Sequence, residues 1–293
     1  MDEEEKALRL VRYLHSNVES YGLLTTEEEI IDLPALSGIM KRPLPSSLLG
    51  LVSLGMEGTS AVESLMCVLT EDERKEAAIP MKNVSLLTPL ASPPKIICLG
   101  LNYRDHAEEQ GARIPDEPII FFKPRTALIG PDEPILRPGF VKQLDYEAEL
   151  AVVIGRKGKN ISVADAEKHI FGYTAFNDVS ARDIQSKDRQ WTRGKSFDTF
   201  APTGPCITTA NQVDNPQNLR IRTRVNGELR QNSSTKNMAF NVYAVIHHIS
   251  RVMTIEPGDI IATGTPPGVG PMQKGDKIVI EVEGIGRLEN AVA

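Results

Sequence analysis

The chain has 293 residues, 41% apolar and 25% charged, which is enough to build a substantial core. Its 33 Lys and Arg against 39 Asp and Glu give a net charge of −6, which argues against a nucleic-acid partner. No apolar run reaches the roughly 20 residues that a membrane helix needs. The acidic start at residues 1–5 is unlike a secretory leader, so we expect a cytoplasmic protein with no membrane partner. The scattered cysteines fit neither a disulfide framework nor a zinc knuckle and are expected to be buried thiols: Cys67, Cys98 and Cys206.

The beginning of the chain predicts a small unit that mixes strands and helices. Residues 8–14 are β-like, although the same segment could form a helix, and residues 30–33 are also β-like. The apolar residues of 48–70 favour a helix, and residues 71–75 continue it as a charged surface. These segments together indicate an α+β unit.

Clustered prolines at 87–94 forbid regular pairing, so we place a domain boundary there, with domains at 1–90 and 91–293. The second domain is rich in predicted strands, with a helix at 241–253 and a hairpin turn at Asn226-Gly227. The predicted strands lie at 95–99, 119–123, 149–154, 171–176, 219–225, 259–263 and 277–283.

Two carboxylates stand two positions apart at the start of the apolar run 149–154. Glu147 and Glu149 would project from the same side of a strand, close enough to share one cation. If buried, they need a cation or a proton between them, whereas the alternative is a polar strand edge that faces solvent. Asp178 follows the run 171–176 and could supply a third oxygen ligand, although it could also cap a following helix. Such an all-oxygen set suits Mg²⁺, Mn²⁺ or Ca²⁺ rather than zinc.

Five motifs, in one order along the chain, resemble signatures of the fumarylacetoacetate hydrolase family. The resemblance covers about residues 95–293, and the first 90 residues resemble the small N-terminal domain of many bacterial members. The motifs are GLNYRDHAEE at 100–109, DYEAEL at 145–150, FNDVSARDIQ at 176–185, GKSFDTF at 194–200 and ATGTPPGVG at 262–270. We therefore expect an α+β fold: a strand-rich mixed β-sandwich or roll that carries a small N-terminal α+β domain.

The resemblance implies roles for two groups of residues. Glu147, Glu149 and Asp178 would hold the metal. His106 and Glu109 would form an acid/base pair on a segment that orders over bound substrate. Their spacing of three agrees with this role, because on a helical turn the carboxylate would orient the imidazole. An isolated pair with this spacing could instead be an ordinary polar turn.

The remaining motifs imply substrate contacts. Lys195, in a glycine-flanked loop, would stabilise developing negative charge. Arg182 and Gln185 would share one face of a helix that begins at the last metal ligand, and would bind a carboxylate and a carbonyl. Thr265 would hydrogen-bond the substrate, and Tyr103 is a candidate to read its tail. A solvated helix face, a surface lysine and a turn threonine are the alternatives.

The implied activity is a divalent-metal-dependent hydrolysis of a C–C bond in a small 2,4-dioxo acid, of acylpyruvate or fumarylpyruvate type, through a metal-stabilised enolate. The same site could instead isomerise, tautomerise or decarboxylate a 2-oxo diacid such as oxaloacetate or 2-hydroxyhepta-2,4-dienedioate. A metal-dependent binding protein for 2-oxo acids is an alternative of another class, but pure binding needs no base such as His106. The implied cofactor is Mg²⁺ or Mn²⁺, with Ca²⁺ also compatible, and the implied assembly is a homodimer.

Overall fold

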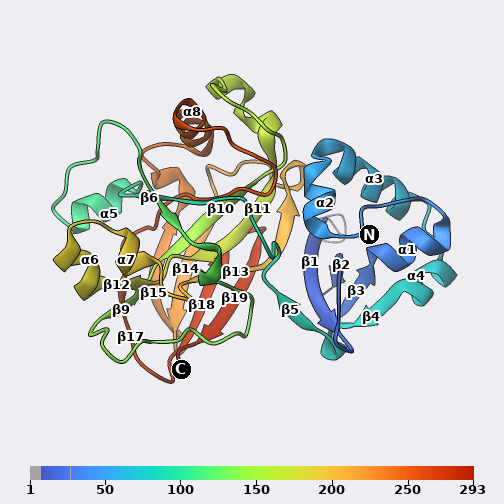
Figure 1. Cartoon of the computed structure of the whole chain (residues 1–293), viewed down its shortest axis with the longest axis horizontal. Coiled ribbons are helices and arrows are strands. Elements are labelled where there is room, and N and C mark those ends of the chain that lie inside the picture. The colour runs from blue at the N-terminus through green and yellow to red at the C-terminus, as the bar shows by residue number, and fades with distance from the viewer. Residues whose placement is uncertain (1–7, 27) are drawn as a thin grey trace.

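The structure is a computed structural model that describes residues 8–26 and 28–293, so the acidic start at residues 1–5 lies outside the described residues. Helices α1–α4 gather beside strands β1–β4 in one part, and a larger strand-rich part contains the C-terminus (Figure 1). This arrangement of mixed sheets and helices confirms the predicted α+β class.

The N-terminal segment folds into strands and helices. Of the predicted segment 8–14, residues 9–14 belong to a strand, so the alternative helix is wrong. The helix predicted at 48–70 is two helices, because the chain turns at Gly55 with φ of 58°. Cys67 ends the second of these helices and is exposed, so the prediction of a buried thiol is wrong there. The elements are β1 (Arg9–His15), β2 (Val18–Thr26), β3 (Glu29–Asp32), α1 (Leu33–Met40), α2 (Leu48–Ser53), α3 (Met56–Cys67), α4 (Glu71–Ala77), β4 (Ala78–Pro80) and β5 (Ser85–Leu87).

The larger part is dominated by strands, as predicted, and the hairpin at Asn226-Gly227 joins β14 to β15. The cysteines in this part, Cys98 and Cys206, are buried thiols. The strands are β6 (Ile96–Gly100), β7 (Ile119–Lys123), β8 (Leu128–Ile129), β9 (Leu144–Tyr146), β10 (Ala148–Ile154), β11 (Ile170–Asn177), β12 (Ser180–Ala181), β13 (Ala201–Thr209), β14 (Arg220–Val225), β15 (Glu228–Ser234), β16 (Ile260–Ala262), β17 (Gly270–Met272), β18 (Lys277–Val282) and β19 (Gly286–Ala291). The helices are α5 (Arg104–Glu109), α6 (Arg182–Asp188), α7 (Thr192–Lys195) and α8 (Val242–Val252).

The strands form three sheets within the described ranges. The largest has the order β4-β3-β2-β1-β13-β11-β10-β16-β6-β7, with β5 beside β1 and β8 beside β13. Smaller sheets have the orders β12-β9-β17 and β15-β14-β18-β19. Because β1 pairs antiparallel with β13, with Arg9 opposite Thr208, the N-terminal strands continue the sheet of the larger part. The division of the chain near residue 90 stays a prediction.

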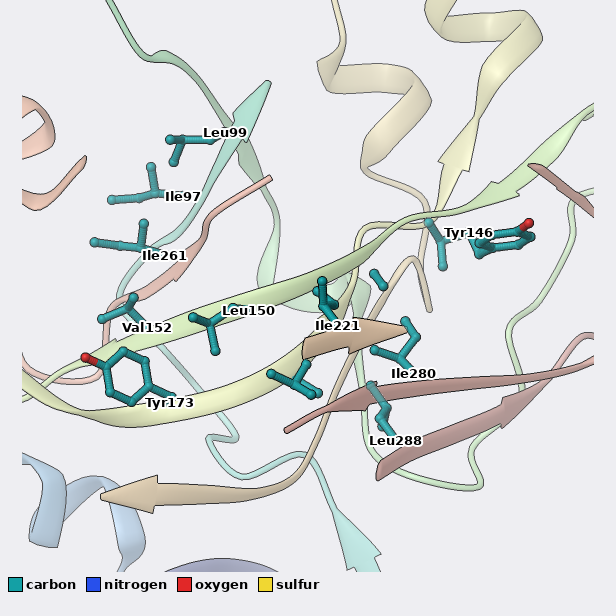
Figure 2. Close-up of a cluster of buried hydrophobic side chains, with 14 of the residues drawn as sticks. Ile97, Leu99, Tyr146, Leu150, Val152, Tyr173, Ile221, Ile261, Ile280 and Leu288 are labelled. Carbon is teal, nitrogen blue, oxygen red and sulfur yellow. The ribbon is translucent and has the colours of Figure 1, made fainter. Parts of the chain in front are cut away.

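Side chains of β10 alternate between two cores, because successive residues of a strand point to opposite faces of the sheet. Leu150 and Val152 pack with Ile221 and Ile280 of the four-stranded sheet, as Figure 2 shows. Ala151 and Val153 face the other core, which includes apolar side chains of α1–α3. Glu149 has the parity of this second set, so the strand directs its carboxylate away from the sheet-on-sheet core.

No helix among those described is both long enough and apolar enough to span a membrane.

Candidate active site

A break between two strands positions the first carboxylate. Glu147 lies between β9 and β10; its backbone N–H donates to Asn177 Oδ1 at 3.0 Å and its carbonyl accepts from the N–H of Asp178 at 2.9 Å. Glu149 is the second residue of β10, and Asp178 follows the paired strand β11 directly, where Ala148 stands opposite Asn177. The pairing of β10 with β11 thus brings all three acidic residues to one place.

The three carboxylates converge in the interior. Glu147, Glu149 and Asp178 each offer an oxygen, and these oxygens lie within 4.8 Å of one another. All three residues are buried, and Glu149 and Asp178 are 0% exposed. This confirms the predicted convergence of three oxygen donors, and it excludes the alternative of a strand edge that faces solvent.

Buried cations neutralise part of this charge. Lys195 Nζ donates to Glu147 Oε2 at 2.8 Å and to Asp178 Oδ2 at 2.6 Å. Lys123 donates to the other oxygen of Asp178 and, at 3.1 Å, to the carbonyl of Val179. With both carboxylate oxygens engaged by lysines, Asp178 caps no helix: α6 begins at Arg182, so the helix-cap prediction is wrong.

Arg182 supplies a third cation. Its guanidinium donates to Glu147 and, at 2.9 Å, to Asp145 Oδ2, and at 2.7 Å to the side-chain oxygen of Gln185. Burial alone would raise the pKa of Glu147, but Lys195 and Arg182 hold it well below its ordinary value. Glu147 is therefore an anion in the folded protein.

Glu149 differs from its two neighbours because, within the described residues, no cationic side chain bonds to it. Its Oε2 accepts from the N–H of Gly264 at 2.7 Å, and its Oε1 is buried with no partner among the described residues. Burial, followed by the charges of Asp178 and Glu147, raises the pKa of this carboxyl well above its ordinary value. An orphaned carboxylate oxygen beside two other carboxylates fits a hard divalent cation, which would supply the missing charge.

Lys195 lies at the end of the short helix α7 and not in the predicted loop. Burial would lower its pKa, but the adjacent Asp178 and Glu147 raise it above the ordinary value, so the amine stays an ammonium. Its Nζ also lies 5.3 Å from the centroid of the Phe121 ring. An ammonium group cannot accept a proton, so Lys195 in this state is not a base, and its predicted role of stabilising negative charge stays a prediction.

The predicted acid/base pair is assembled on α5. His106 Nδ1 lies 3.0 Å from Glu109 Oε2, and its Nε2 lies 2.9 Å from the side-chain nitrogen of Gln110. Glu109 also accepts, through Oε1, from the N–H of Gly268 at 3.0 Å, which ties α5 to the glycine-rich segment. Because the side-chain nitrogen of Gln110 can only donate, Nε2 is the acceptor in this contact, and Nδ1 is the nitrogen that donates to Glu109.

A cavity of about 560 Å³ is lined by His106 and Glu109 as well as by Lys195 and Glu147. Thr265 lies on its wall, and its hydroxyl oxygen accepts from Gln231 Nε2 at 2.9 Å. This contact holds the hydroxyl in place, and its predicted hydrogen bond to substrate stays a prediction. Tyr103 does not reach the wall; its side chain is fully buried and its hydroxyl has no partner in the described parts of the chain. The wall comprises Leu99, Gly100, Leu101, His106, Glu109, Gln110, Phe121, Gln143, Asp145, Glu147, Arg182, Gln185, Ser186, Arg189, Trp191, Lys195, Thr265 and Val269.

Three residues that support the carboxylates were not predicted from the sequence: Lys123, Asp145 and Ser180. Lys123 ends the apolar strand β7, and a lysine in such a run is the signal that could have marked it as a buried partner. Asp145 and Ser180 support the carboxylates: Asp145 accepts from Arg182, and Ser180 Oγ donates to Glu147 Oε1 at 3.1 Å. Helices α5, α6 and α7 all lie on the side of the molecule away from α1–α4 (Figure 1).

Comparison with known proteins agrees with this arrangement. Residues 95–293 match the family described as fumarylacetoacetate (FAA) hydrolase C-terminal. The chain belongs to the fumarylacetoacetate hydrolase family. It is 42% identical over 298 residues to a Xenopus laevis protein named oxaloacetate tautomerase fahd2, mitochondrial, and the match covers 98% of this chain and 90% of that protein.

Solved structures of the family superimpose over almost the whole chain. A 2-hydroxyhepta-2,4-diene-1,7-dioate isomerase from Mycobacterium marinum is 36% identical with a TM-score of 0.76, and the match covers 98% of each chain. A maleylpyruvate hydrolase from Sphingobium sp. SYK-6, in complex with manganese(II) and pyruvate, is 34% identical with a TM-score of 0.80, over 98% of this chain and 99% of that one. Members with this fold thus bear the names of hydrolases, isomerases and tautomerases.

Proposed function

We propose that the protein is a divalent-metal-dependent enzyme that interconverts the keto and enol forms of a small 2-oxo diacid of the oxaloacetate class. The observation that carries the proposal is that one cavity is lined both by the His106–Glu109 pair and by Glu147 of the carboxylate triad. The identity of 42% to an oxaloacetate tautomerase over nearly the full chain supports this reaction.

The triad of Glu147, Glu149 and Asp178 would hold the cation, with Mg²⁺ or Mn²⁺ favoured by the hard oxygen donors. When bound, such a cation supplies positive charge to the carboxylate and carbonyl oxygens of a 2-oxo acid, which favours the enolate over the ketone. Lys195 remains an ammonium beside the triad and adds positive charge on the same side of the substrate.

His106 supplies the proton transfer. Its Nε2 is the acceptor nitrogen in the observed hydrogen bonds, so it can remove a proton from the carbon next to the ketone once the substrate displaces Gln110. Glu109 holds the imidazole by Nδ1 and stabilises the imidazolium that results. Returning the proton to the carbonyl oxygen completes the reaction, which moves one proton from carbon to oxygen and needs no second base.

Hydrolysis of a C–C bond in a 2,4-dioxo acid is the second candidate. The same Nε2 can take a proton from water, and the structure of a maleylpyruvate hydrolase, which holds manganese(II) and pyruvate, supports this reaction. Hydrolysis needs a water molecule placed beside the distal carbonyl in addition to the base. Tautomerisation needs the base but no water molecule at that position.

Ultraviolet absorbance of the enol separates the two reactions. We expect the protein with Mg²⁺ or Mn²⁺ to accelerate the approach of oxaloacetate to its keto–enol equilibrium beyond the rate with metal alone, without consuming the compound. Excess chelator and His106→Asn should each remove the acceleration. Loss of an acylpyruvate with release of pyruvate would instead establish the hydrolase. No effect on either compound, with metal bound, would contradict both candidates.

A further inference from the structure

Helix α6 and the residue that follows it contribute a strip of the cavity wall, formed by Arg182, Gln185, Ser186 and Arg189. Arg182, Gln185 and Ser186 lie three and four positions apart, on one face of α6, and Arg189 is the residue directly after its last turn. The strip begins at the carboxylate triad, where Arg182 bonds to Glu147, and it ends at Arg189.

Arg189 differs from the other cations of the wall. Arg182 and Lys195 are both bonded to carboxylates of the site. Arg189 is exposed and has no ion pair or hydrogen bond with any described residue. Its guanidinium is therefore available to a ligand, whereas the two inner cations are already engaged by the protein.

The backbone at Arg189 is also unusual. The residue terminates α6 in the left-handed region, with φ of 57° and ψ of 1°. Glycine is the ordinary residue at such a helix end, because a Cβ makes this conformation unfavourable. Arg189 thus carries a long cationic side chain at a position whose positive φ favours glycine, which has no side chain.

We propose that Arg189 binds a second carboxylate, at the end of the substrate away from its 2-oxo acid group, and so selects diacids over acids with a neutral tail. The proposal rests on the proposed function. Seven steps along a helix span about 10 Å, so Arg189 stands at the far end of the strip from Arg182 and the carboxylate triad. The side chain of Arg189 is long enough to reach back along the cavity, so it can also contact the second carboxylate of a short diacid.

The test compares oxaloacetate with its distal monomethyl ester, which keeps the 2-oxo acid group and lacks the second charge. Arg189→Gly suits the positive φ, so this variant should unfold at no lower temperature than the wild type. We expect its ratio of kcat/KM for diacid over ester to fall about tenfold, mainly through KM, because a charge-assisted hydrogen bond is lost. Arg189→Lys should restore part of the ratio.

Two controls isolate the contact from general electrostatics. Lys187→Gln removes one positive charge from the exposed face of the same helix, outside the cavity wall, and should leave the ratio unchanged. Inhibition by oxalate, which resembles only the metal-binding end of the substrate, should be the same in wild type and Arg189→Gly. A ratio that is equal in wild type and Arg189→Gly would overturn the proposal.

The two proposals fail in different ways. If the wild type with Mn²⁺ turns over neither compound, the proposed function fails. Calorimetric titration of the same two compounds into the Mn²⁺-loaded protein then tests Arg189 by itself. Preferential binding of the diacid that Arg189→Gly abolishes supports the assignment, and equal affinities of the wild type for diacid and ester overturn it.

Discussion

Gln110 and His106 are joined through the imidazole nitrogen that Glu109 does not contact: Gln110 Nε2 lies 2.9 Å from His106 Nε2. Glu109 occupies the other ring nitrogen at 3.0 Å. The two contacts together select the tautomer in which Nε2 is the proton acceptor. If His106 is the base, as we propose, Gln110 positions its ring through this contact and moves away when substrate binds.

Replacing Gln110 with Glu should change the pH dependence of turnover. A carboxylate beside Nε2 favours the imidazolium, so the base becomes active only at higher pH. We expect the acidic limb of the kcat/KM profile to move up by about one pH unit. Gln110→Leu, which adds no charge, should lower the rate without moving the limb upward. Identical profiles for Gln110→Glu and wild type would contradict the assigned contact.

Removing the base should separate turnover from metal binding. His106→Asn is expected to lower kcat by about 10² to 10⁴, the usual contribution of a general base. Because His106 bonds to no residue of the carboxylate triad, Mn²⁺ affinity should stay within about twofold of wild type. Steady-state kinetics and calorimetry check the two halves. Full activity in this variant would exclude His106 as the base.

The raised pKa of Glu149 predicts a coupling between metal, pH and stability. Without metal, a carboxyl whose pKa is raised by folding stabilises the fold at low pH, and this contribution is lost as pH rises through the folded pKa. A bound cation removes the penalty, so the gain in Tm on adding Mg²⁺ should grow as pH increases. Thermal unfolding at several pH values checks this. A gain that shrinks with pH would contradict the coupling.

Gly264 is expected to tolerate no side chain. Its φ is 94°, its N–H donates to Glu149, and an added Cβ would lie 2.8 Å from Cβ of Asn102. Gly264→Ala should lower the free energy of unfolding by about 1 to 3 kcal/mol and weaken Mn²⁺ binding. Gly111→Ala is the matched control, because Gly111 also has positive φ but open space around it. Equal losses of stability and of Mn²⁺ binding in both variants would mean that positive φ alone causes them, and would contradict the role of the contacts with Asn102 and Glu149.

The central strands and the acidic triad follow from local sequence pattern. Apolar runs bounded by turn residues predict β10 and β11, and once these strands pair, Asp178 lies next to the segment that carries Glu147 and Glu149. His106 and Glu109 are three positions apart, so one helical turn suffices to join them. The family motifs add roles that these patterns alone leave open, and the homodimer and the cytoplasmic location stay predictions.

Contacts between distant segments could not be predicted in the same way. Lys123 donates to Asp178, which lies 55 positions away in the sequence, and neither local sequence predicts this pair. From the sequence alone, Asp178 can be both a third oxygen ligand and a helix cap, and only the contacts of the two lysines and the start of α6 exclude the cap. The pairing of β1 with β13 is equally remote in sequence, because strand order depends on the packing of the whole chain.

Binding of Mn²⁺ to the protein, followed by the electron paramagnetic resonance signal of the free ion, tests the metal site most directly. We expect one high-affinity Mn²⁺ per chain, abolished by Glu149→Gln and by Glu147→Ala, and unchanged by Glu228→Gln on the exposed strand β15. A wild-type protein that leaves Mn²⁺ free, or triad variants that bind it as tightly as wild type, would contradict the assignment of a divalent cation to this site.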